Sequence, residues 1–588
     1  MPTAEHAPME LPTFRQSLVF EGKTLLLKAW RLLKDLSSGV RRHRKSKEFA
    51  TSEILGSSVT SLWSNAHPAE MDLTAGKVQN LREACRALDG VIVPAGEAFS
   101  FWKQLGRATK RRGYVSGREL REGCLIPTVG GGLCQISNAL YDAALNSGME
   151  IVERHAHSQV IPGSLAEQGR DATVFWNYVD LRFRSDRAFR IEARLSKDDL
   201  IVSLKGESSD RGQTKQSIGE DFISVPVGNC FTCEKSGCFR NDHRVAEDVR
   251  FGRTAFVVDA FWPEFDQYIF ETRNEDDVLL LPLDGKKWGK ENYAWEVKSF
   301  SNVGFAKRAV AERSIAMRKM PRQGSALQKG LLKFDEKMAT ALARQIEFDV
   351  KHVVVSQNLL PFLWRDGFLG GRTFDVLMTR FPMGELQRRL SEAHEKYPES
   401  PTLSDFRADS ELVALEEDAL RHSARIVTPH AGIADFFEDR AVVELPWSMP
   451  DIAKTEAPGG PPVILFAASA LARKGFYEFR DAVSDLPVRV MVAGGAVEFE
   501  NPWEGVETVP FSVDWPTKVS LAVLPAHVEH QPRRILRAIA AGVPALVSSA
   551  CGLREREGLT VIDEPDADEI RKILRNLPAL QQPVAHRS

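Results

Sequence analysis

Residues 130–148, GGGLCQISNALYDAALNSG, constrain the fold most strongly, because three consecutive glycines lead directly into a segment with helical periodicity. Glycine adopts backbone angles closed to other residues, so Gly130, Gly131 and Gly132 predict a sharp turn with peptide N–H groups near a bound group. Cys134 then falls in the first helical turn, where the macrodipole favours a thiolate. The stretch predicts a reactive cysteine or, alternatively, a small cysteine that packs under the turn.

Two histidines follow this predicted helix and supply the candidate base. His155 and His157 lie in the segment ERHAHS, although neighbours of a helix in sequence need not be its neighbours in space. The flanking sequence predicts a helix over 81–88, a strand over 91–93 and three short antiparallel strands after residue 169. We therefore expect an α+β domain in which the cysteine helix packs on a small sheet.

The segments NLREACRALDGVIVPAGEAFSFW, GGGLCQISNALYDAALNSGMEIVERHAHS and GRDATVFWNYVDLRFRSD resemble the VanW family over roughly residues 75–205. The resemblance implies a bacterial protein linked to the cell envelope, and it brings no established reaction. By analogy with transglutaminase-like and papain-like folds, Cys134 would be the nucleophile and His157 or His155 the base. Asp171 would orient the imidazole, with Asp180 an equal candidate. The implied reaction class is acyl transfer or amide hydrolysis, and the alternative is that these side chains only bond backbone or arginine.

A second group of soft ligands lies in VGNCFTCEKSGCFRNDHR, where three cysteines and a histidine are spaced C-x2-C-x4-C-x4-H. Four such ligands satisfy a tetrahedral zinc ion, and they also suit an iron–sulfur cluster. Redox-active or free thiols are the alternative. The predicted metal ligands are Cys230, Cys233, Cys238 and His243.

From residue 251 the chain alternates apolar strands with helices, which is typical of parallel sheets. Strands are predicted at TAFVVDAF, DVLLLPL, HVVVSQN, FDVLMTR, ARIVTPH and AVVELP, and long helices over about 325–348 and 410–421. After a linker rich in proline and glycine, a second set runs through PVILFAAS, VRVMVAGG, LAVLP and PALVSSA. The predicted fold class is multidomain, an α+β domain followed by two Rossmann-like lobes, with ligands expected at strand ends.

This second half resembles the GT-B glycosyltransferases of the glycosyltransferase-4 type, most clearly in its last 130 or so residues. FAASALARKGFYEFRDAV is similar to the strand, loop and helix that carry the family's phosphate-contacting lysine, which falls at Lys474. LAVLPAHVEHQPRRILRAIAAGVPALVSS is similar to the E-x7-E segment, whose first glutamate falls at Glu529. The resemblance implies a nucleotide-sugar donor, with Lys474 stabilising the diphosphate and Glu529 accepting bonds from sugar hydroxyls.

Two positions depart from that family pattern. The glutamate expected to hold the nucleotide ribose is replaced by Arg537, and the arginine expected before the lysine is replaced by Ser469. Loss of the ribose carboxylate removes a charge-assisted hydrogen bond of about 1.5 to 3 kcal/mol. Arg537 suits a phosphate contact instead, and the alternative is a module that binds without catalysis.

The N-terminal segment LVFEGKTLLLKAWRLLKDLSSGV predicts an amphipathic helix with a basic end, and residues 18–47 suit either an anionic membrane surface or docking on the next domain. The net charge of -3 gives no reason to expect a nucleic-acid partner. Without a secretory signal or a membrane-length apolar run, we expect a cytoplasmic protein, with peripheral contact at the inner membrane face as an option. The predicted segments are 1–50 (basic amphipathic), 51–215 (VanW-like), 216–250 (Cys/His-rich connector), 251–447 and 448–588 (GT-B-like lobes).

Two functions from different classes follow from the sequence. In the first, the chain transfers a sugar from a nucleotide-sugar donor to a cell-envelope glycan or glycolipid, which the retained Lys474 and Glu529 favour. In the second, the chain is a binding or scaffold protein with a degenerate GT-B module, which Ser469 and Arg537 favour. A cysteine-dependent acyl-transfer or amidase activity of the VanW-like domain is a further alternative.

Overall fold

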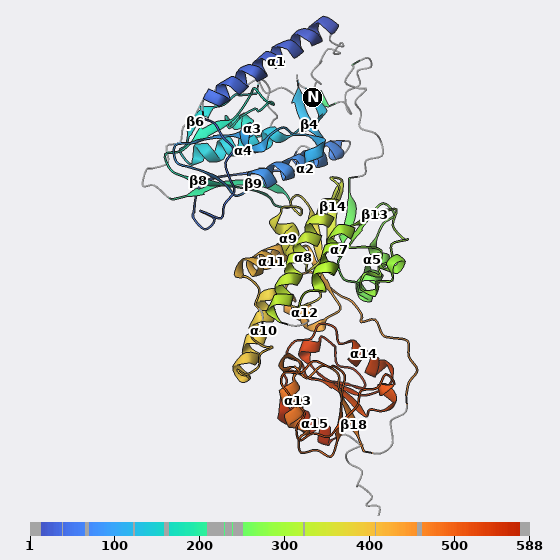
Figure 1. The fold of residues 1–588 in the computed structure, drawn as a ribbon. Coiled ribbons are helices and arrows are strands. Elements are labelled where there is room, and N and C mark those ends of the chain that lie inside the picture. The colour runs from blue at the N-terminus through green and yellow to red at the C-terminus, as the bar shows by residue number, and fades with distance from the viewer. Residues whose placement is uncertain are drawn as a thin grey trace, which may run out of the picture. The chain divides into compact units, whose positions relative to one another are not determined.

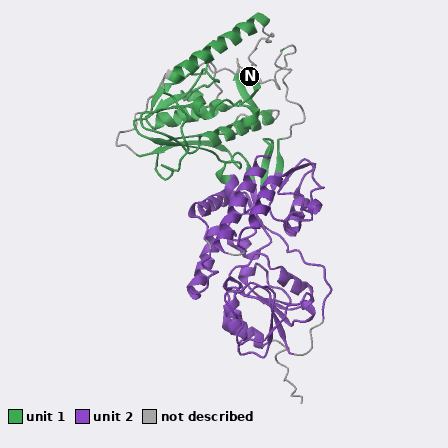
Figure 2. Cartoon of the chain, in the orientation of Figure 1, with its two compact units in different colours: residues 1–254, 346–353, 364–373 green, residues 255–345, 354–363, 374–588 purple. Residues whose placement is uncertain are grey.

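The fold was determined as a computed structural model. The structure describes residues 13–37, 39–64, 70–121, 124–157, 164–207, 228–229, 238, 251–321, 324–405, 407–455 and 461–576. These residues form two compact units (Figure 2). Unit 1 comprises Met1–Thr254, Ile346–Val353 and Trp364–Thr373, and unit 2 comprises Ala255–Gln345, Val354–Leu363 and Phe374–Ser588.

Unit 1 is an α+β fold built on three small sheets (Figure 1). Its helices are α1 (Phe14–Ser37), α2 (Met71–Leu88), α3 (Phe101–Leu105) and α4 (Leu133–Asn146). Its strands are β1 (Glu53–Ser61), β2 (Val91–Val93), β3 (Ala98–Ser100), β4 (Ser116–Arg121), β5 (Cys124–Val129), β6 (Glu150–Glu153), β7 (Arg182–Arg184), β8 (Phe189–Leu195), β9 (Asp199–Gly206) and β10 (Gly228–Asn229).

The core of unit 1 lies between its helices and a four-stranded antiparallel sheet of order β1-β9-β8-β2. α4 packs on β1 and β9, and α2 packs on β8. Ile136, Ala139 and Leu140 recur at helical spacing along α4 and are fully buried, which explains why this helix holds its place. The helix after the glycines, the strand over 91–93 and the antiparallel strands after residue 169 were all predicted from the sequence and are confirmed.

Unit 2 consists of two lobes, each with a largely parallel sheet. The first lobe contains β11 (Arg253–Val257), β12 (Val278–Leu281), β13 (Asn302–Phe305), β14 (Val350–Ser356), β15 (Thr373–Leu377), β16 (Arg425–Thr428) and β17 (Val442–Glu444). Its helices are α5 (Pro263–Thr272), α6 (Gly285–Trp288), α7 (Lys307–Met317), α8 (Ser325–Ala343), α9 (Leu360–Arg365), α10 (Met383–Lys396), α11 (Ser410–His422) and α12 (Ala431–Phe436). The strand order is β13-β12-β11-β14-β15-β16-β17.

The second lobe repeats this pattern on a smaller scale. Its strands are β18 (Val463–Phe466), β19 (Arg489–Val492), β20 (Thr508–Val509), β21 (Leu521–Leu524), β22 (Ala545–Ser548) and β23 (Leu559–Ile562), and its helices are α13 (Phe476–Val483), α14 (Arg533–Ala540) and α15 (Ala567–Arg575). All its strand pairs are parallel, in the order β20-β19-β18-β21-β22-β23.

In both sheets the chain adds three strands in one direction and then returns to the other side of the first strand, as doubly wound Rossmann-like folds do. The switch point lies between β11 and β14 in the first lobe and between β18 and β21 in the second. Ligands of such sheets bind at the carboxyl ends of the strands beside the switch point. The predicted fold class, an α+β domain followed by two α/β lobes, is confirmed. Within the described part of the chain, no helix combines the length and apolarity needed to cross a membrane.

Candidate functional site

The glycine turn that precedes α4 has the backbone conformation that the sequence predicts. Gly130 and Gly132 have φ angles of 85° and 94°, which residues with a side chain rarely adopt. A Cβ atom added at Gly132 would lie 2.2 Å from the Cγ atom of Lys77. Gly132 is also the N-cap of α4, so the turn fixes where the helix begins.

Cys134 is the second residue of α4 and is half-buried. Its Sγ atom lies 3.8 Å from the Thr173 hydroxyl and 4.0 Å from the Val174 carbonyl oxygen. Cys134 therefore lies in the first turn of α4, where the positive end of the helix dipole favours negative charge.

His157 and Asp171 complete the site around this cysteine. His157 Nδ1 lies 2.5 Å from Asp171 Oδ1, and the backbone N–H of His157 donates to the other carboxylate oxygen. Asp171 is fully buried, so its charge depends on these bonds. The side chain of His157 also lies close enough to Cys134 for each group to shift the pKa of the other. Because Nδ1 faces Asp171, the opposite ring nitrogen is the one left for the thiol.

The charges of the three side chains support one another. Burial alone would raise the pKa of Cys134, but the hydrogen bond and charge of His157 outweigh it and leave the pKa below its ordinary value. Burial would lower the pKa of His157, but its bonds to Asp171 and Cys134 raise that pKa to about 10. The arrangement therefore favours a thiolate beside an imidazolium, the reactive state of a nucleophilic cysteine.

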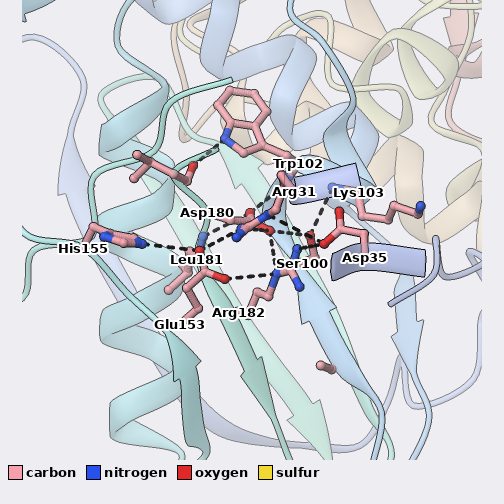
Figure 3. A network of polar contacts seen from close by, with 12 residues as sticks. Arg31, Asp35, Ser100, Trp102, Lys103, Glu153, His155, Asp180, Leu181 and Arg182 are labelled. Carbon is pink, nitrogen blue, oxygen red and sulfur yellow. Dashed lines mark hydrogen bonds and ion pairs between the residues drawn. The ribbon is translucent and has the colours of Figure 1, made fainter. Parts of the chain in front are cut away.

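The other two candidates from the sequence lie elsewhere. The ring of His155 is half exposed and its Nε2 lies 3.3 Å from Glu153. Asp180 accepts hydrogen bonds from Ser100 and Arg182 in a separate buried network (Figure 3). The structure thus brings together Cys134, His157 and Asp171, and leaves His155 and Asp180 outside the group.

Two further residues support the site and were not anticipated from the sequence. Ser137 donates to the Ala172 carbonyl at 2.6 Å, and Asn138 accepts from the Ala172 N–H at 2.8 Å. These bonds hold the segment that carries Asp171 and Thr173 against α4. Their position three and four residues after Cys134, on the same helical face, was the available signal.

The second candidate site lies at the switch point of the last sheet. Lys474 follows β18 and Glu529 follows β21, the two strands that flank that point. Lys474 Nζ lies 2.9 Å from Glu529 Oε2 and 3.1 Å from the Val528 carbonyl oxygen. The other oxygen of Glu529 accepts from the backbone N–H groups of His530 and Gln531.

The charge of Glu529 is well stabilised by these contacts. Burial would raise its pKa, but Lys474 and the two N–H donors outweigh burial and leave the pKa below its ordinary value. Arg537 lies apart from this pair, with its guanidinium 5.8 Å from the Trp515 ring and a bond to the Val513 carbonyl. The structure therefore joins Lys474 and Glu529, and places Arg537 against Trp515.

His430 links the two lobes of unit 2 rather than offering a base. Its Nε2 lies 3.0 Å from the Glu529 carbonyl oxygen and 3.2 Å from that of Ala550, while its Nδ1 accepts from the Ile433 N–H. Both ring nitrogens are thus engaged by backbone, and burial lowers the pKa of the ring. A neutral imidazole in a fixed tautomer is the result.

The predicted metal site falls mostly outside the described residues. Cys230, Cys233 and His243 lie outside them, and Cys238 alone is described. Within the described ranges, no group of three or more histidine, cysteine or acidic residues could hold a metal ion. A zinc or iron–sulfur site at these four residues stays a prediction.

Cys134, His157 and Asp171 all lie in a segment that is similar to known proteins. Residues 76–205 match the family described as VanW like protein. This segment is a VanW-like domain. It is similar to the protein YoaR of Bacillus subtilis (strain 168), 35% identical over 127 residues, which cover 21% of this chain and 41% of that protein. It is also similar to the vancomycin B-type resistance protein VanW of Enterococcus faecalis, 33% identical over 135 residues, which cover 22% and 48%.

The chain thus spans less than half the length of these two relatives. Among solved structures, it is similar to a sucrose-phosphate synthase from Thermosynechococcus elongatus, with 11% identity and a TM-score of 0.38, over 56% of this chain and 91% of that one. It is also similar to HepE of Anabaena in complex with UDP and glucose, with 13% identity, a TM-score of 0.33 and the same coverages. The assignment of two Rossmann-like lobes rests on the strand orders of the chain itself.

The glycine turn yields a first prediction. The change Gly132→Ala should lower the free energy of unfolding by about 1–3 kcal/mol, because alanine is strained at this φ and its Cβ meets Lys77. Thermal unfolding followed by circular dichroism measures the change. Gly148→Ala, at a positive φ but in open space, separates the backbone strain from the contact with Lys77. Equal losses in both variants would show that the contact contributes nothing.

Proposed function

We propose that the VanW-like domain catalyses acyl transfer or amide hydrolysis, with Cys134 as the nucleophile. The observation that carries the proposal is the group formed by Cys134, His157 and Asp171, in which His157 is hydrogen-bonded to Asp171 and lowers the pKa of the Cys134 thiol. A nucleophile, a base and a residue that orients the base are the parts that covalent acyl transfer requires.

The proposed reaction begins with the thiolate of Cys134. The sulfur attacks the acyl carbon and forms the S–C bond, while N–H groups of the first turn of α4 stabilise the oxyanion. The C–N bond of the amide then breaks, and the imidazolium of His157 gives its proton to the leaving amine. Water or a second amine attacks the thioester and passes a proton back to His157, which regenerates the thiolate.

Asp171 contributes by holding His157 rather than by exchanging protons. Its carboxylate accepts from both the ring and the backbone of His157, so the ring cannot rotate away from the cysteine without losing a bond. The negative charge also stabilises the imidazolium that balances the thiolate. Thr173, whose hydroxyl lies near Sγ, is a further donor to the thiolate.

The rate of alkylation tests the ion pair directly. Iodoacetamide should label Cys134 with a rate that rises with pH around a midpoint below the ordinary thiol value, since the thiolate is the reactive form and its pKa is lowered. Asp171→Asn removes the charge that raises the pKa of His157, so the imidazolium is lost at lower pH and the midpoint for Cys134 should move upward. Peptide mass spectrometry measures both labelling rates.

Cys85 provides the internal control within the same domain. It is fully buried and burial raises its pKa, so it should stay unlabelled at neutral pH in both proteins. Equal, slow labelling of Cys134 and Cys85 would remove the case for a nucleophile. An unchanged midpoint in Asp171→Asn would remove Asp171 from the group.

Acyl chemistry is tested with a simple activated ester. Addition of p-nitrophenyl acetate should release p-nitrophenol in a burst equal to the enzyme concentration and leave an acetyl group on Cys134. Cys134→Ser should abolish the burst, and His157→Ala should slow it at least a hundredfold, as expected for loss of a general acid–base. Cys124→Ser is the matched control, because it removes another half-buried thiol of the domain. A burst that persists in Cys134→Ser would exclude this site.

We further propose that residues 251–588 transfer a sugar from a nucleotide-sugar donor to a cell-envelope glycan or glycolipid. The position of Lys474 and Glu529 at the strand ends beside the switch point favours this function. A diphosphate placed there would attract the ammonium of Lys474, and Glu529 would keep its two backbone donors. The ribose would be bound without a glutamate at position 537.

Calorimetry with the full chain and a panel of uridine, guanosine and adenosine diphosphate sugars tests this second function. At least one donor should bind, and Lys474→Gln should weaken its binding about tenfold or more, since one charge-assisted bond is lost. Lys518→Gln changes a half-exposed lysine of the same lobe and should leave binding unchanged. Absence of binding by every donor would leave a scaffold role for these residues.

A further inference from the structure

Helix α1 contacts the rest of unit 1 through its polar side. Arg31 is buried, with 4% of its side chain exposed, and bonds Glu153 at 2.7 Å. Asp35, one turn later, bonds Arg182 at 2.5 Å. At about 3.6 residues per turn, the half-buried residues of the helix fall on this same side. They are Ser17, Thr24, Lys28 and Asp35.

A network of five charged side chains fixes this orientation (Figure 3). Two arginines of the network lie between three carboxylates, and the side chains come from α1, β6, β7 and the position two residues before β7. Removal of one member of such a buried network leaves another charge without compensation, so the helix keeps its rotation about its axis. The members are Arg31, Asp35, Glu153, Asp180 and Arg182.

The opposite side of α1 is apolar and exposed, and we call it the outer face. Leu26 is 72% exposed, Leu33 67% and Trp30 60%. A helix that packs on a core shows the reverse, with apolar residues inward and polar residues outward. The outer face consists of Leu18, Leu25, Leu26, Trp30, Leu33 and Leu36. An exposed apolar stripe of this length marks a binding surface.

The charges beside the outer face indicate what covers it. By helical spacing, Lys23 and Lys34 lie at one border of this face, Glu21 lies toward the other border, and Arg15 falls on the face near the start of the helix. The Lys34 ammonium is 5.2 Å from the Trp30 ring. A second copy of the helix would bring these like charges together, whereas anionic headgroups would neutralise them. Tryptophan and lysine beside leucines are typical of helices that lie in a membrane interface. The helix is not apolar enough to cross a membrane.

We propose that α1 binds the surface of a membrane that contains anionic phospholipid. The outer face enters the acyl boundary, and Arg15, Lys23 and Lys34 contact the headgroups. Because the ion network already orders the helix, binding requires no folding step. The proposal does not depend on the chemistry at Cys134, whose burst with p-nitrophenyl acetate is measured without lipid.

Sedimentation with vesicles tests the proposal on the full chain. The protein should sediment with vesicles of phosphatidylcholine and phosphatidylglycerol, and binding should weaken with added salt or without phosphatidylglycerol. The double variant Leu26→Gln/Leu33→Gln should bind at least tenfold more weakly, because it removes two leucines that the membrane would bury. Lys23→Gln/Lys34→Gln should abolish the preference for phosphatidylglycerol.

A matched control removes exposed apolar side chains from elsewhere in the chain. Ile315 and Val513 are 60% and 80% exposed, so Ile315→Gln/Val513→Gln should bind vesicles as the wild type does. All variants keep Arg31 and Asp35, and circular dichroism with alkylation of Cys134 confirms that the fold is retained.

Three outcomes would overturn the proposal. They are failure of the wild type to bind either vesicle, equal loss of binding in the control, and retained binding in Leu26→Gln/Leu33→Gln. Light scattering tests whether a second copy of the chain covers the outer face instead. In that case the wild type would be a dimer that does not bind vesicles, and Leu26→Gln/Leu33→Gln would be a monomer.

Discussion

The first site depends on one interaction, the pair of hydrogen bonds between the buried carboxylate of Asp171 and His157. Both carboxylate oxygens are bonded by a single residue, His157, through the ring and through the backbone N–H. A buried carboxylate keeps its charge only with such compensation, and the charge in turn keeps the imidazole protonated. The imidazolium then lowers the pKa of Cys134 against the effect of burial. The proposed reactivity of Cys134 therefore depends on Asp171, which acts through His157.

Helix α4 carries both Cys134, the proposed nucleophile, and the residues that support that carboxylate. Ser137 donates to the carbonyl of Ala172 and Asn138 accepts from its N–H, directly after Asp171. The glycine turn sets the start of the helix, which sets the register of all three side chains. A shift of α4 by one residue would turn Cys134 away and release Ala172 at the same time. This explains why the glycines, the cysteine and the two polar residues occur as one unbroken stretch.

Regular periodicity made much of the fold predictable from sequence, including α4 and most strands of both parallel sheets. β13, β20 and β23 were missed because they are short strands toward the sheet edges, with partly exposed residues. The sequence could not decide whether His155 or His157 is the base. Both lie in a segment without regular secondary structure, so no periodicity indicates which ring faces Cys134. The choice of Asp171 over Asp180 required knowing that Asp180 belongs to the network that holds α1. By contrast, the meeting of Lys474 and Glu529 follows from strand order alone.

In the proposed donor site, the pair of Lys474 and Glu529 would be neutral at rest and would still accept an anion. Glu529 is held by two backbone N–H groups on one oxygen, so its charge does not rely on the lysine alone. In the proposed donor site, a diphosphate would exchange one anionic partner of Lys474 for another, which costs less than uncovering an isolated ammonium. The lysine also bonds the Val528 carbonyl, which holds it near the strand end during that exchange. Arg537 contacts Trp515 and the Val513 carbonyl instead of this pair.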